Sequence, residues 1–174
     1  LSKDLTFDEI VVSADGSIFD ATVNETPYGL ALTNGDLTFN ANNQGLEVIG
    51  RVRLNGVQAD LNWQTNFDSK SEIHNRFGLT GRVNDRERSM VGMIPVPFLT
   101  GPVDVDIDFT EFYDGRTILV LDGDITHATV DFRSIDWRKP PREKGKFEIF
   151  MVTEPNGSVD IQSFTLEAGD MNVL

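Results

Sequence analysis

Apolar and polar residues alternate along most of this chain. The clearest stretch is Val103-Asp104-Val105-Asp106-Ile107-Asp108-Phe109. A period of two is the period of a β-strand, so the apolar side chains of this stretch lie on one face and the three aspartates on the other. The same alternation runs through residues 37–41, 46–54 and 57–63. The pattern predicts a sheet that is apolar on one face and polar, largely acidic, on the other.

Asn-Gly and Asp-Gly pairs separate many of these runs, and such pairs supply the two positive φ angles of a type I′ hairpin. They occur at 15–16, 34–35, 55–56, 114–115 and 156–157. The chain is therefore expected to be all-β, with antiparallel meander sheets that form either a curved groove or a sandwich-like arrangement. The expected strands lie near 6–13, 17–24, 29–33, 36–41, 45–54, 57–66, 75–80, 102–111, 116–122, 124–133, 145–153, 157–167 and 170–174.

One segment breaks the alternation. Asn84 or Asp85 can cap a helix and Gly92 can end it, which predicts one short helix near residues 83–91. The apolar stretch 94–99, with two prolines, then suggests an extended connection that covers the core or contacts a partner. A chain of 174 residues fits a single β-rich domain, residues 1–174.

Composition and motifs argue against several classes of function. With 28 acidic and 15 basic residues and a formal net charge of -13, the chain repels phosphate backbones, so we expect no nucleic-acid partner. It has no cysteine, and we find neither a nucleophile elbow nor a phosphate loop. The aspartates at 104, 106 and 108 resemble the start of an EF-hand loop, but Phe109 and Gly115 stand where glycine and glutamate are required. We expect no enzyme activity, no metal and no cofactor.

Basic residues are concentrated near the end of the chain, beside Pro140-Pro141. Such a cluster can bind lipid head groups or an acidic partner, or it can be a solvated connection that balances nearby carboxylates. The candidate head-group or partner patch comprises Arg133, Arg138, Lys139, Arg142, Lys144 and Lys146.

The chain resembles the central region of the AsmA-like bacterial envelope proteins, the group that contains YhdP and is related to TamB. The resemblance rests on Gly101-Pro102-Val103 before an alternating strand, on 124–128 and on 136–140, together with the β-repeat patterns before them, and covers about residues 17–168. It implies a slice of a larger periplasmic protein that is anchored in the inner membrane and has an apolar β-groove. Members are linked to phospholipid transport between the inner and outer membranes and to outer-membrane barrier integrity. The implied partners are phospholipid acyl chains and adjacent segments of the same protein, with membrane contact through the anchor only.

Alternation and resemblance together give a set of candidate lipid-contacting residues: Val103, Val105, Ile107, Phe109, Val130, Phe132, Phe147, Ile149 and Met151. The same pattern also suits a closed sandwich whose apolar faces bury one another and which serves as a non-catalytic structural or interaction module of the envelope. The sequence leaves both readings open.

Overall fold

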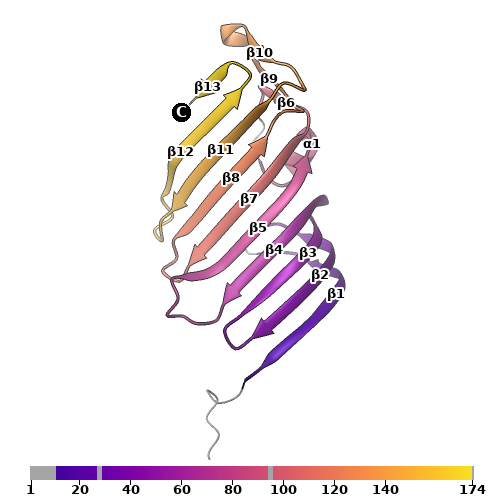
Figure 1. The fold of residues 1–174 in the computed structure, drawn as a ribbon, viewed down its shortest axis with the longest axis vertical. Helices are drawn as coiled ribbons and strands as arrows, with labels where there is room; N and C mark the ends of the chain where they lie inside the picture. Colours follow the sequence, from indigo (N-terminus) through magenta and orange to yellow (C-terminus); the bar gives the residue numbers. More distant parts are fainter. Residues whose placement is uncertain (1–10, 27–28, 94–95, 174) are drawn as a thin grey trace, which may run out of the picture.

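A computed structural model describes residues 11–26, 29–93 and 96–173. Among these residues it contains thirteen β-strands, one α-helix and a 3₁₀ turn, η2 (Figure 1). Their bounds are β1 Ser13–Val23, β2 Leu32–Asn42, β3 Gly45–Leu54, β4 Val57–Asn66, β5 Ile73–Val83, α1 Asp85–Met90, β6 Leu99–Thr100, β7 Val103–Phe112, β8 Thr117–Asp124, β9 Thr129–Phe132, η2 Arg133–Ile135, β10 Trp137–Lys139, β11 Gly145–Thr153, β12 Val159–Ala168 and β13 Met171–Val173.

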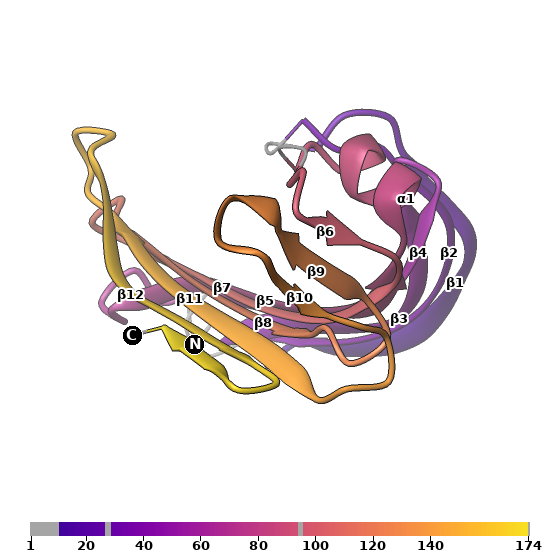
Figure 2. The ribbon, with the colours of Figure 1, turned by 90° about the horizontal axis from the view of Figure 1, so that it is seen from above.

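Ten strands form one antiparallel meander in the order β1-β2-β3-β4-β5-β7-β8-β11-β12-β13, and the other three form a small sheet in the order β10-β9-β6. The large sheet is not closed, because β1 and β13 lie at opposite edges. Its strands curve around a concave face, here called the trough, and Figure 2 shows α1 and the small sheet inside it. The fold is therefore all-β with antiparallel meander sheets and one short helix, as the sequence predicts, and of the two arrangements that the sequence leaves open it is the curved groove and not a sandwich of two large sheets.

The two faces of the large sheet follow the alternation strand by strand. One row of register partners, in which Gly50 is the exception to an apolar series, runs through Ile18, Leu37, Gly50, Leu61, Leu79, Ile107, Leu121, Ile149 and Phe164. The next row is polar and runs through Asp36, Arg51, Asp60, Thr80, Asp106, Asp122, Glu148 and Thr165. The apolar row faces the trough and the polar row covers the outer face, which is where the aspartates of β7 lie.

Three of the five predicted turns join neighbouring strands. Asn55-Gly56 joins β3 to β4 with φ angles of 47° and 85°, as a type I′ turn requires. The pairs at 114–115 and 156–157 lie in the β7–β8 and β11–β12 connections, and in each of them only the glycine has a positive φ.

The other two pairs lie inside strands, so predicting turns there was wrong. Asn34, with φ 49°, sits in β2 where the register with β3 shifts, so its positive φ produces a bulge and not a hairpin. Gly16 lies in β1 against the ring of Phe39, where a Cβ would come within 2.9 Å of Cε1. Residues 6–10 of the first expected strand and residue 174 of the last lie outside the described residues.

The strand expected over 124–133 is divided between the two sheets. Asp124 ends β8 and accepts a hydrogen bond from the Thr126 amide at 2.7 Å. The Ala128 amide then donates to the Ile125 carbonyl at 3.0 Å, which completes a turn before β9 begins in the small sheet. This turn carries the chain from β8 in the large sheet to β9 in the small sheet.

The predicted helix is confirmed as α1, one turn and a half in length. The Asn84 side chain caps it by accepting from the amides of Arg86 and Glu87, and the backbone amide of Asn84 donates to the Glu87 carboxylate at 2.9 Å. This capping box stabilises a helix that is too short to persist alone.

Buried apolar residues form two clusters. The larger one joins β4, β5, β7 and β12 of the large sheet to the Ile125–Ala128 turn and β9, through Val57, Val83, Val103, Ile125, Ala128, Val130, Leu166 and Ala168. The smaller one, Leu37, Val48 and Val52, lies in the curved β2–β3 region. The larger cluster holds the small sheet against the trough.

Candidate functional site: an apolar cavity in the trough

The small sheet lies over the C-terminal half of the trough, and α1 lies beside it toward β3 and β4, where Asn55 donates to the Met90 carbonyl at 2.8 Å (Figure 2). The small sheet, α1 and their connections are here called the roof. Between this roof and strands β7, β8, β11, β12 and β13 lies a cavity of about 800 Å³. Binding pockets for small molecules typically measure about 300–1,000 Å³. Its described lining residues are Arg88, Met93, Val96, Phe98, Leu99, Val103, Val105, Leu121, Ile125, Val130, Phe132, Ser134, Ile135, Phe147, Ile149, Met151, Phe164, Leu166, Met171 and Val173.

The lining is almost entirely aliphatic and aromatic. Arg88 and Ser134 are the exceptions among the described lining residues. Several large apolar side chains of the lining are nevertheless accessible to water: Ile135 is 64% exposed, Phe164 41% and Val173 40%. Exposed apolar side chains gathered around a cavity are a feature of binding sites for apolar ligands. These three residues lie on η2, β12 and β13, which places an open side of the cavity there.

Seven of the nine candidate lipid-contacting residues line this cavity. Val105, Phe147, Ile149 and Met151 form part of its floor, and Phe132 belongs to its roof. Val103 and Val130 also belong to the lining, but they are buried, with only 1% and 2% of their surface exposed.

Ile107 and Phe109 lie on the same face of the sheet but outside the cavity lining. Ile107 pairs in register with Leu121, and the ring of Phe109 lies 6.2 Å from that of Phe77. They extend the apolar surface of the trough toward its N-terminal half.

The roof is anchored at one end by Lys139, whose side chain is buried. Its ammonium group donates to the carbonyls of Ile125 at 2.8 Å, Ala128 at 2.9 Å and Pro140 at 3.2 Å. Burial lowers the pKa of Lys139, and the nearby Glu143 and Asp124 carboxylates oppose that shift. Lys139 therefore holds the Ile125–Ala128 turn to β10 and does not belong to a surface patch, which corrects that part of the prediction.

The other five basic residues are exposed and come from four parts of the fold. Arg133 lies 3.5 Å from Asp131, and Lys146 of β11 pairs with Glu167 of β12 at 3.1 Å. Arg138 lies on β10, whereas Arg142 and Lys144 lie in the connection to β11. In sequence, Arg133 is next to the lining residues Phe132 and Ser134, and Lys146 is next to the lining residue Phe147.

Aromatic contacts and one indole hydrogen bond fix the β9–β10 hairpin that carries η2. The ring of Phe132 lies 4.6 Å from Phe98 and 5.8 Å from Trp137. The Trp137 indole donates to Asp170, in the turn between β12 and β13, at 2.9 Å. The hairpin is thereby held beside the C-terminal edge of the trough.

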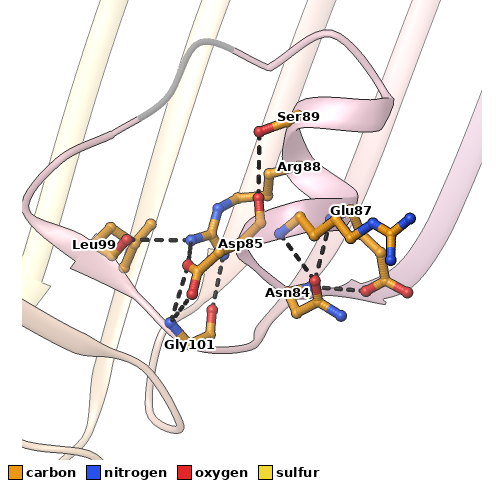
Figure 3. A network of polar contacts seen from close by, with 8 residues as sticks. Asn84, Asp85, Glu87, Arg88, Ser89, Leu99 and Gly101 are labelled. Carbon is orange, nitrogen blue, oxygen red and sulfur yellow. Dashed lines mark hydrogen bonds and ion pairs between the residues drawn. The ribbon is translucent and has the colours of Figure 1, made fainter.

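The other end of the roof is held by a polar network around α1 (Figure 3). Arg88 donates to the carbonyls of Gly101 at 2.8 Å and Leu99 at 3.2 Å and forms an ion pair with Asp85. Asp85 in turn accepts from the Gly101 amide at 3.1 Å. This network fixes β6 to the helix and closes one side of the cavity.

Sequence reasoning identified Val130 and Phe132 but missed other residues of the roof and much of the floor. The floor residues Phe164 and Leu166 follow the same alternation as their neighbours and could have been found from it, whereas Leu121 ends the continuous apolar run 118–121. The roof residues Arg88, Phe98 and Ile135 carry no periodic signal, because contacts between distant parts of the chain bring them to the cavity.

In the part of the chain that the structure describes, no helix is long and apolar enough to cross a membrane. No group of three or more potential metal-binding side chains occurs among the same residues. No protein-family model, curated protein or solved structure matches this chain.

Proposed function

We propose that this chain binds acyl chains in the cavity of its trough and acts as a segment of a periplasmic lipid-transport protein of the bacterial envelope. The observation that carries the proposal is the cavity itself: about 800 Å³ lined by apolar side chains, with large apolar residues exposed at one side. An acyl chain gains binding free energy by leaving water and needs no directional partner, which is what such a lining offers.

The resemblance to AsmA-like envelope proteins supports the cellular part of the proposal. An open sheet in which β1 and β13 are the edge strands among the described residues also suits a segment whose neighbours in a longer chain extend the same trough. In that setting the net transport would move phospholipid between the two membranes.

Two adjacent residues of β8 provide a matched test. Leu121 lines the cavity, whereas Val120 pairs with Asp108 and Phe150 on the outer face. Leu121→Asp places a charge in the lining and should reduce bound lipid by more than roughly tenfold, while Val120→Asp leaves binding unchanged. Native mass spectrometry after incubation with phospholipid vesicles measures both variants beside the unmodified chain.

Circular dichroism and urea unfolding show first that each variant is folded. Equal lipid occupancy in the Leu121→Asp variant and the unmodified chain would contradict the proposal, as would an unmodified chain that takes up no lipid.

A further inference from the structure

Charge in the cavity is distributed unlike charge in the rest of the chain. The chain has 28 acidic residues, yet none of the described lining residues is acidic. The charged residue of this lining is Arg88, a cation, with 11% of its side chain exposed. A ligand that carried a positive charge into the cavity would meet this cation and no described acidic lining residue.

Arg88 retains hydrogen-bonding capacity. A guanidinium has five N–H donors. The contacts to Gly101, Leu99 and Asp85 use Nη1 and Nη2, so Nε has no acceptor among the described residues. The Asp85 carboxylate that balances the charge is 53% exposed and does not line the cavity. Since Arg88 itself lines the cavity, we infer that a ligand carboxylate there can accept a single further hydrogen bond from it.

The geometry points to a preference for long-chain carboxylates, with the acid group at Arg88 and the acyl chain along Leu121 and Ile149. This inference rests on the proposed acyl-chain binding and specifies the ligand. A carboxylate is small and can accept a charge-assisted hydrogen bond from an N–H of Arg88 that has no acceptor among the described residues, whereas a phosphoglycerol head group would have to be accommodated against apolar walls. Arg88 is thus inferred to determine specificity in addition to supporting the roof.

The test compares a saturated fatty acid with its methyl ester, which has the same chain but no charge. For the unmodified chain we expect the acid to bind at least roughly tenfold more tightly, the scale of a charge-assisted hydrogen bond. Titration with each ligand at neutral pH, below its micelle concentration, gives the two dissociation constants, and lysophospholipid serves as a third ligand.

Asp85→Asn is the most informative variant. Asparagine still accepts a hydrogen bond from the Gly101 amide but no longer neutralises Arg88, so the preference for acid over ester should increase. If the carboxylate of Asp85 matters only for structure, the variant weakens the binding of both ligands equally or leaves both dissociation constants unchanged. Asp104→Asn is the matched control, because it removes the partner of Arg82 on the outer face and should leave both constants unchanged.

Arg88→Met should remove the preference while the ester still binds, and Arg88→Lys should retain part of it. If Arg88→Met does not fold, the Arg88→Lys and Asp85→Asn variants still test whether Arg88 causes the preference for acid over ester. Acid and ester binding equally to the unmodified chain, or lysophospholipid binding more tightly than the acid, would overturn this inference and leave acyl-chain binding intact. Failure of all three ligands to bind would instead refute the proposed function.

Discussion

Gly123 lies on the floor of the trough in β8, in register with Val105 and Phe147. The Phe147 ring covers it so closely that a Cβ would lie 2.8 Å from Cδ1 and closer still to Cε1 and Cζ. Gly123→Ala therefore requires the ring to move, and Phe147 lines the cavity. Because the φ of Gly123 is not positive, alanine itself fits the backbone.

We expect Gly123→Ala to lower the free energy of unfolding by about 1–2 kcal/mol. Overpacking a core costs about 1–3 kcal/mol, and the smaller conformational entropy of unfolded alanine offsets about 0.4–1 kcal/mol. The displaced ring should also reduce acyl-chain binding. Urea unfolding followed by tryptophan fluorescence measures the first effect, and titration with a fatty acid measures the second.

Gly78→Ala is the control, because a Cβ there would have no neighbour closer than 3.7 Å. A double variant adds a further check: combining Gly123→Ala with Phe147→Leu should cost less than the sum of the single changes, by about 0.5–3 kcal/mol. The reasoning is refuted if Gly123→Ala matches Gly78→Ala in both stability and binding, or if the double variant is strictly additive.

Three further predictions concern polar contacts. Asn84→Ala removes the cap of α1 and should lower the free energy of unfolding by about 0.5–2 kcal/mol in urea, whereas Asn84→Asp should retain most of it. Lys139→Met leaves buried carbonyls without a donor and should lower the free energy of unfolding by at least about 1–3 kcal/mol. Because burial lowers the pKa of Lys139, the unfolded chain binds more protons than the folded chain at pH values between the folded and unfolded pKa of this residue. The free energy of unfolding of the unmodified chain, relative to that of the variant, should therefore rise with pH in this window, and a fall would contradict the argument. Hydrogen bonds from Thr126 lower the pKa of Asp124, so their stabilisation is present at neutral pH and lost as pH falls below about 4; Asp124→Asn should flatten that acid dependence, which a series of urea titrations would show.

The alternation of apolar and polar residues was sufficient to predict a sheet with one apolar face, but not to choose between an open trough and a closed sandwich. Alternation, together with the family resemblance, assigned Val105, Ile149 and Met151 to the apolar face, because side chains alternate along a strand. The capping pattern at Asn84 likewise predicted α1, because a helix cap depends on residues that are close in sequence.

The roof could not be predicted in this way. Lys139 was assigned to an exposed cluster because its sequence neighbours are basic, whereas its buried ammonium group donates to the carbonyls of Ile125 and Ala128 in the turn before β9. Gly16 and Gly35 were interpreted as hairpin residues, although one accommodates the Phe39 ring and the other lies at a bulge beside Ala21. In each case the deciding contact joins residues far apart in the chain.

The most direct test of the account is photo-crosslinking with a fatty acid that carries a diazirine in its acyl chain, followed by peptide mass spectrometry. The account predicts that labels fall on residues of the floor and roof, such as Leu121, Ile149 and Phe132, and that unlabelled fatty acid suppresses them. Val120 and Phe150, on the outer face of the same strands, should remain unlabelled. Labels that fall equally on both faces, or that excess fatty acid does not suppress, would contradict an acyl-chain site in the trough.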